Sequence, residues 1–249
     1  AKGIPYEKQM EWCKAGNAGK PQRDWMYATI ASHIVKTHKP NLLMLHLMSV
    51  DALEHATGRQ SPEAYWAVND SDNRVRDLVD AVEAAGMKDR TTFIISSDHG
   101  FITYTNSINP NVLLRKEGLL TTAGPTIKSR QAYCLGQGGG AFIYVLDQAN
   151  RDAILARIKP KLAAMEGVEV LIDRKDFAKF GHHLPEQNPQ EPDLMLSAKD
   201  GYSFSDTAAG ELEVTPSGSP KGTHGYSPWH PLMYGTFVAS GAGIKKGAK

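Results

Sequence analysis

The distribution of apolar residues predicts two buried strands in the N-terminal half of the chain. Residues 42–48 form a continuous apolar run that only His46 interrupts, and residues 91–96 (TTFIIS) form a second run. Short apolar runs without alternation are typical of strands that are buried on both faces, as in parallel sheets. We therefore expect both runs to be strands of a parallel sheet, with His46 as a core residue.

Helical patterns flank these two runs. Apolar residues at helical spacing predict a helix over 24–36, with Asp24 as its N-cap. A longer helix is predicted over 61–85, with Pro62 in its first turn and Gly86 after its end. The resulting order of helix, strand, loop, helix, strand and loop is typical of βαβ units. It predicts an α/β protein with a mostly parallel central sheet and helices on both faces.

The rest of the chain shows weaker signals. They predict a short helix at 109–117, a helix at 151–165 broken by Pro160, and strands at 132–135, 141–146, 168–172, 193–196 and 235–240. Residues 1–20 are expected to be irregular, and no helix or strand is predicted in the Gly-, Ser-, Thr- and Pro-rich stretch 205–223. The glycine-rich residues 136–140 lack the following Lys-Ser/Thr of a phosphate-binding loop, so they predict a turn. We expect residues 1–249 to form a single partial catalytic domain, with a small inserted subdomain at 105–205 as the alternative.

Composition and charge narrow the classes of function. The chain has 249 residues, 41% of them hydrophobic, which is enough for a sizeable core. Its formal net charge of +1 argues against a protein that binds nucleic-acid duplexes or membrane surfaces. No stretch approaches the ~20 apolar residues of a membrane span, so none is expected. The two cysteines, Cys13 and Cys134, have no metal-binding spacing and make no disulfide framework.

Asp51 and His55 are the first candidates for chemistry. They follow the apolar run 42–48 and are predicted to lie in the loop before the helix 61–85. Their four-residue spacing lets a turn-like backbone aim both side chains at one ion, and a carboxylate with an imidazole is a common zinc pair. The alternative for this pair alone is a helix-capping Asp and a surface His.

Two further candidate groups follow. Asp98 and His99 end the second predicted strand, where Gly100 allows the backbone turn that two adjacent ligands of one metal need. A Ser-His-Asp arrangement is the alternative, but no G-x-S-x-G sequence supports it. His224 lies in the sequence GTHGY between two glycines, where a loop histidine with no partner is the alternative. Together, the three groups indicate a pair of metal ions of the kind used for phosphoryl transfer.

The context of these residues makes the pattern more specific. The segments are LHLMSVD at 45–51 followed by His55, ISSDHGF at 95–101, GTHGY at 222–226 and FVASGAGIKKG at 237–247. In this order they resemble the alkaline phosphatase superfamily and, within it, the type I phosphodiesterase and nucleotide pyrophosphatase family. The resemblance covers about residues 25 to 247 and implies an alkaline-phosphatase-like α/β sandwich.

The resemblance also implies a ligand set for two zinc ions. Asp51, His55 and His224 would hold one zinc, which makes that site complete in side chains. Asp98 and His99 would hold the second, whose remaining ligands in the family are an Asp and a Thr or Ser nucleophile that lie upstream. Nothing before Asp51 matches those two ligands. The resemblance therefore describes an internal fragment, which a second chain or segment would complete.

The activity implied by the resemblance is hydrolysis of phosphodiesters or nucleotide pyrophosphates through a covalent Thr or Ser intermediate. The substrate would be a small-molecule phosphate ester, and Lys221 and Tyr226 are candidate substrate contacts, with packing or solvation as the alternative. A catalytically silent metal-binding chain is one competing interpretation. A phosphonate hydrolase, sulfatase or phosphomutase of the same superfamily is another. The resemblance favours a secreted or periplasmic location, which the chain itself does not show.

Overall fold

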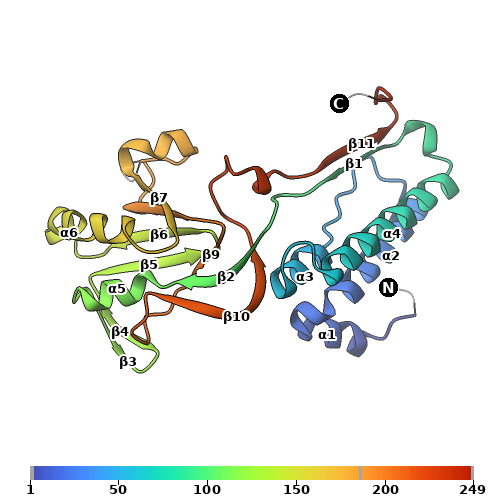
Figure 1. The fold of residues 1–249 in the computed structure, drawn as a ribbon. Coiled ribbons are helices and arrows are strands. Elements are labelled where there is room, and N and C mark those ends of the chain that lie inside the picture. The colour runs from blue at the N-terminus through green and yellow to red at the C-terminus, as the bar shows by residue number, and fades with distance from the viewer. Residues whose placement is uncertain (1–2, 185–186, 248–249) are drawn as a thin grey trace. The chain divides into compact units, whose positions relative to one another are not determined.

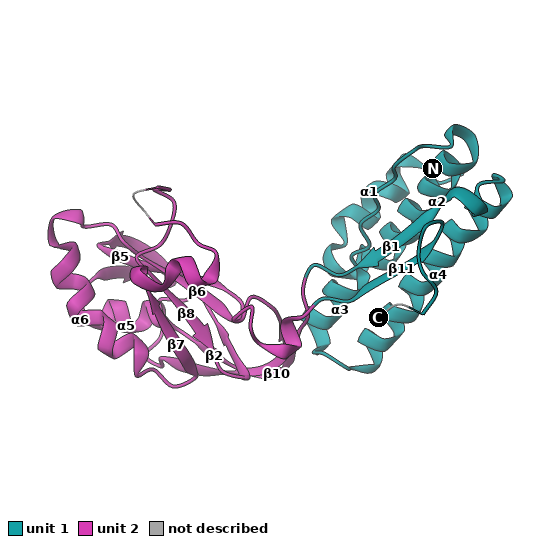
Figure 2. Ribbon diagram, turned by 90° about the horizontal axis from the view of Figure 1, so that it is seen from above, with its two compact units in different colours: residues 1–98, 235–249 teal, residues 99–234 magenta. Residues whose placement is uncertain are grey.

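A computed structural model describes residues 3–184 and 187–247 of the chain. They divide into two compact units: unit 1 comprises Ala1–Asp98 with Gly235–Lys249, and unit 2 comprises His99–Tyr234 (Figure 2). The chain therefore crosses between the units at two peptide bonds, after Asp98 and after Tyr234. The predicted single domain with an insertion at 105–205 stays a prediction.

Unit 1 is built mainly from helices. These are α1 (Tyr6–Lys14), α2 (Lys20–His38), α3 (Ser49–Thr57) and α4 (Pro62–Ala84), with short 3₁₀ turns η1 (Gly16–Gly19) and η2 (Lys88–Arg90). Helices α2 and α4 lie side by side (Figure 1) and bury small residues such as Ala28, Ala31 and Ala81. The Ser61 hydroxyl caps α4 by accepting the Ala64 N–H at 3.0 Å. No described helix is both long and apolar enough to cross a bilayer.

The two predicted helices of this unit are confirmed, but two details were wrong. Asp24 is not an N-cap, because α2 begins earlier, at Lys20, and places Asp24 inside the helix with no exposed surface. Residues 1–20 are also not irregular, since they include α1. A helical signal was present in the sequence but was not used: apolar residues recur at the spacing of one helix face at Tyr6, Met10 and Cys13.

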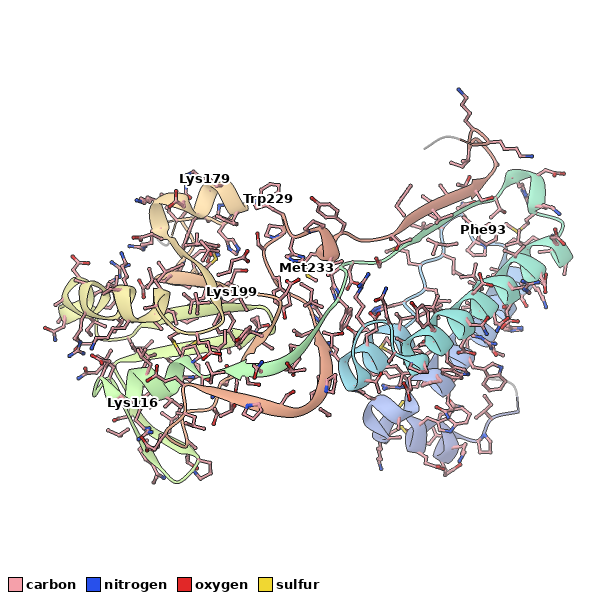
Figure 3. The ribbon with its side chains drawn as sticks, in the orientation of Figure 1. Phe93, Lys116, Lys179, Lys199, Trp229 and Met233 are labelled. Carbon is pink, nitrogen blue, oxygen red and sulfur yellow. The ribbon has the colours of Figure 1, made fainter. Side chains whose placement is uncertain are left out.

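Strands β1 (Thr92–Ser96) and β11 (Phe237–Gly241) form an antiparallel pair in unit 1. Phe93 of β1, labelled in Figure 3, packs on a cluster that includes Val35 of α2 and Val82 of α4. Ile94 and Phe237 are exposed at 64% and 70%. The second apolar run is thus a strand as predicted, but it pairs antiparallel and is largely uncovered.

The strand predicted at 42–48 is wrong. Residues 42–47 belong to no helix or strand, and Leu42 and Met44 are exposed at 78% and 86%. Their neighbours Leu43, Leu45 and Leu47 are half-buried, so side chains still alternate as they do along an extended strand. No described strand pairs with this segment, so its backbone makes no ladder of hydrogen bonds to a neighbouring strand. The prediction that His46 is a core residue is wrong for the same reason, since its side chain is exposed.

Unit 2 contains a four-stranded antiparallel sheet. Its strands, in spatial order, are β5 (Ala132–Gln137), β6 (Gly140–Val145), β8 (Leu194–Ala198) and β7 (Val168–Asp173). Buried and half-buried residues alternate along β6. Helices α5 (Pro110–Lys116) and α6 (Arg151–Ala163) contribute Leu114 and Leu162 to one core with Ile143 and Leu194 of the sheet. The predicted break at Pro160 is wrong, because α6 continues past Pro160 to Ala163.

A second sheet of unit 2 lies next to the candidate ligands His99 and His224. It orders β10 (Val214–Thr223), β2 (Ile102–Ile108) and β9 (Gly201–Phe204), and a separate hairpin joins β3 (Leu120–Ala123) to β4 (Thr126–Arg130). The remaining 3₁₀ turns are η3 (Gln148–Asn150), η4 (Arg174–Phe180) and η5 (Pro231–Met233). Among the described strands only β2 and β9 pair in parallel, so the predicted mostly parallel sheet is only partly found. Strand β10 lies within the stretch 205–223, where no strand was predicted.

Candidate metal centre

Unit 1 presents an Asp–His pair on helix α3. Asp51 and His55 are one helical turn apart, so they share a face of the helix, and Asp51 Oδ1 lies 3.4 Å from His55 Nε2. Both side chains are partly exposed, at 47% and 35%. The sequence predicted that these two side chains lie close together, as they do, but placed them in a loop; their role as metal ligands stays a prediction. In the structure both residues lie on a nine-residue helix, which places side chains four residues apart on the same face.

Asp98 and His99 follow β1, at the boundary between the two units. Asp98 belongs to unit 1 and is exposed, whereas His99 belongs to unit 2 and is half-buried. The His99 Nδ1 atom lies 3.1 Å from the carbonyl oxygen of Gly100. A Cβ on Gly100 would overlap the Leu232 carbonyl, and the Gly100 N–H donates to Met233 O at 3.0 Å. The glycine therefore permits close backbone packing directly after the two candidate ligands.

In unit 2, His224 lies directly against His99. Their rings are stacked, with centroids 3.7 Å apart and planes at 17°, and Phe101 contacts both rings at 5.4 Å. The strand register explains this contact: Thr223, the last residue of β10, is opposite Ile102, the first residue of β2. Residues just before β2 and just after β10 must therefore be neighbours.

A glycine turn holds the backbone around His224. The Gly139 N–H donates to the His224 carbonyl at 2.8 Å. A Cβ on Gly138 would overlap that carbonyl, and a Cβ on Gly139 would overlap the Tyr226 ring. The predicted turn between β5 and β6 is confirmed, but its packing role was not predicted. The signal in the sequence was the run of three glycines, Gly138 to Gly140, together with the glycines that flank His224.

The two candidate substrate contacts differ in their surroundings. Lys221 is exposed on β10. Tyr226 is 6% exposed, and its hydroxyl donates to the carbonyl of Tyr202. Burial, with added repulsion from Asp200, raises the pKa of the Tyr226 phenol, so the group is a neutral donor at ordinary pH. The substrate role of both residues stays a prediction.

The structure thus groups the candidate ligands within each unit. Asp51 lies beside His55 in unit 1, and His99 lies beside His224 in unit 2. Carboxylate oxygens and imidazole nitrogens are donors that suit zinc and other borderline divalent ions. The chemistry of this donor set fits the predicted metal ions.

The comparison with protein families shows the family of the chain. The family described as type I phosphodiesterase / nucleotide pyrophosphatase matches residues 6–227. The chain belongs to this family. The match includes all five candidate metal ligands, from Asp51 to His224.

Relatives of this phosphodiesterase family member are longer proteins. An uncharacterized pyrophosphatase/phosphodiesterase of Schizosaccharomyces pombe is 25% identical over 215 residues, which are 85% of this chain and 41% of the yeast protein. Among solved structures, murine ectonucleotide pyrophosphatase/phosphodiesterase 5 is 18% identical with a TM-score of 0.62, over 85% of this chain and 50% of that one. The wild-type alkaline phosphatase PafA is 15% identical with a TM-score of 0.62, over 92% and 46%.

These likenesses confirm the predicted α/β, alkaline-phosphatase-like fold. The chain spans half or less of the length of these relatives.

Proposed function

We propose that the chain carries metal-binding residues of a zinc-dependent hydrolase of phosphate esters, most specifically of phosphodiesters or nucleotide pyrophosphates. The family match supports the reaction class and favours it over the sulfatase and phosphomutase interpretations. The observation that carries the proposal is the pair of Asp51 and His55 on one face of α3, with Asp51 Oδ1 3.4 Å from His55 Nε2. A carboxylate and an imidazole this close together are a common zinc pair.

In this proposal the ligands divide as the family pattern implies. Asp51, His55 and His224 hold one zinc ion, and Asp98 and His99 contribute to a second. If zinc were bound at such a pair of sites, it would supply activation of a nucleophile and neutralisation of charge on the phosphoryl oxygens. The chain's own residues orient the ligands: α3 presents Asp51 and His55 on one face, and the glycine turn fixes the backbone of His224.

The nucleophile and the remaining ligands are proposed to come from sequence outside these 249 residues. Murine ectonucleotide pyrophosphatase/phosphodiesterase 5 has a solved structure of an inactive variant, with one threonine replaced by alanine, in complex with AMP. This supports a threonine, or its serine equivalent, as the nucleophile that forms the covalent intermediate. It also supports a nucleotide-type phosphate ester as the substrate.

Unit 1 has a surface that fits such a second segment or chain. Leu42, Met44, Ile94 and Phe237 are large apolar side chains with more than half of their surface exposed. Residues 42–47 keep the side-chain alternation of a strand without a pairing strand in the described part of the chain. An added strand would supply the missing backbone partners and cover the apolar surface.

The test is metal content. The purified chain is expected to bind about one or two zinc ions per molecule, measured by elemental analysis after dialysis. Asp51→Ala and His224→Ala should each lose zinc, because each removes one of three ligands. His33→Ala, on α2 and outside the candidate site, is the matched control and should keep it. Unchanged zinc in both ligand variants would contradict the assignment.

The competing function is a metal-binding chain without catalytic activity. Phosphodiesterase activity of this chain together with the proposed completing segment distinguishes the two, with bis(p-nitrophenyl) phosphate as the substrate. Zinc-dependent hydrolysis that Asp51→Ala abolishes supports the hydrolase. Zinc binding without hydrolysis by the completed protein favours the silent chain.

A further inference from the structure

Asp24 makes an unusual set of hydrogen bonds for an acidic residue inside a helix. Its side chain has no exposed surface. The carboxylate accepts the N–H of Met48 at 2.9 Å, the N–H of Ser49 at 2.8 Å and the Ser49 hydroxyl. No salt bridge to Asp24 is formed in the described part of the chain. A buried carboxylate is costly unless its charge is compensated, so these donors compensate it.

The donors belong to the start of helix α3. Met48 is the N-cap of α3 and Ser49 is its first residue, and the Met48 side chain makes no capping hydrogen bond. The first N–H groups of a helix have no partner within it, and the helix dipole places partial positive charge there. Asp24 therefore accepts from N–H groups at the start of α3, where the N-cap side chain makes no such bond, and it does so from helix α2, 24 positions earlier.

The contact constrains where α3 lies. Helix α3 has only nine residues, of which Ser49 and Ala52 are buried. A helix this short is not stable by itself, so tertiary contacts must fix its position and its rotation about its axis. The bidentate contact with Asp24 fixes both at the first turn, since the carboxylate meets two successive N–H groups and one hydroxyl.

The same helix carries the proposed ligands Asp51 and His55. We propose that Asp24 is a positioning residue for the metal centre: it holds the first turn of α3 so that Asp51 and His55 face a metal ion together. This inference rests on the proposed function. Groups that orient metal ligands typically change metal affinity about 10- to 100-fold when they are replaced.

The test compares zinc affinity in Asp24→Asn, Asp24→Ala and wild type, by competition with a chromophoric chelator. Asn keeps one acceptor oxygen but turns a donor toward the α3 amides, so its zinc Kd should rise about tenfold, and that of Ala should rise further. The d–d absorption of the cobalt(II)-substituted chain should change in the same order, because the ligand geometry changes. Hydrogen exchange at the amides of Met48 and Ser49 should become faster.

A matched variant separates positioning from general stability. Val82→Ala removes buried methyl groups from the α2–α4 core of the same unit. It should lower the melting temperature through a cavity but leave the zinc Kd and the cobalt spectrum unchanged. Ser49→Ala removes only one of the three donors, so it provides a mild variant that folds if Asp24→Ala does not.

The outcomes distinguish the positioning role of Asp24 from the proposed zinc-dependent function. The inference is supported if the wild type binds zinc and a folded Asp24→Asn variant binds zinc more weakly. Zinc binding by wild type with an unchanged Kd in folded Asp24→Asn overturns the inference and leaves the proposed function standing. A wild-type chain that binds no zinc overturns the proposed function, and the inference with it.

Discussion

Glycines determine how closely the backbone packs around His224. Gly139 donates its N–H to the His224 carbonyl, and the Tyr226 ring lies over the position where a Cβ would be. Any side chain at position 139 must therefore displace either the ring or the turn. This ties the placement of a proposed metal ligand to a residue that has no chemistry of its own.

Gly139→Ala should move the His224 backbone and destabilise unit 2 by about 1–3 kcal/mol, because the added methyl group overpacks a closed contact. The His99 and His224 ring resonances should shift in a ¹H–¹³C NMR spectrum, and zinc affinity should fall. Gly124→Ala is the matched control: its φ is +59° but it has open space around it. It should cost only backbone strain and leave the histidine resonances in place. Unshifted histidines in folded Gly139→Ala would rule out the packing role.

Much of the candidate site could be predicted from the sequence at the residue scale. The four-residue spacing of Asp51 and His55 and the glycines around His224 were visible in the sequence. The stacking of His99 on His224 was not, because it depends on the register between β2 and β10, which are distant in the chain. The role of Asp24 was missed for a similar reason, since its partners at Met48 and Ser49 lie on another element.

At the scale of elements, periodicity predicted the helices well and the strands less well. The predicted helices α2 and α4 are both present, and the start of α4 has a capping serine, Ser61, whereas the cap predicted for α2 at Asp24 was wrong. The segment 42–47 has the composition of a buried strand but no pairing strand, because pairing is a property of two segments. Strand β10 was missed since its Gly, Ser and Pro residues have low strand propensity, and pairing with β2 overrides it.

The exposed side chains of segment 42–47 and of β1 should tolerate polar substitution. Met44→Ser and Ile94→Thr are expected to lower binding of the dye ANS and raise solubility, with a change in stability within about 0.5 kcal/mol, because both side chains are already exposed. Leu43→Ser is the control, since Leu43 packs on the core cluster with Val35. It should destabilise unit 1. Equal destabilisation by Met44→Ser would show that Met44 is buried in solution.

At the scale of the whole molecule, the two units differ in how the chain builds them. Unit 2 is one continuous segment, whereas unit 1 joins two segments that pair as β1 and β11. Unit 2 also has a contiguous core of its own, in which helices α5 and α6 pack on the β5–β6–β8–β7 sheet. A segment with its own core and both ends at one boundary has what independent folding requires.

Residues 99–234 expressed alone should therefore fold with a single cooperative thermal transition and a dispersed NMR spectrum. Leu162→Ala provides the internal control, because Leu162 is fully buried in the unit 2 core. It should destabilise the isolated segment by about 2–5 kcal/mol and lower the corresponding transition of the full chain. If the segment shows no cooperative transition, unit 2 needs unit 1 to fold, and the stacked pair of His99 and His224 would then depend on both. If it folds, the stacking of His99 on His224 is preformed, and the histidine ring resonances should show it without Asp51, His55 and Asp98.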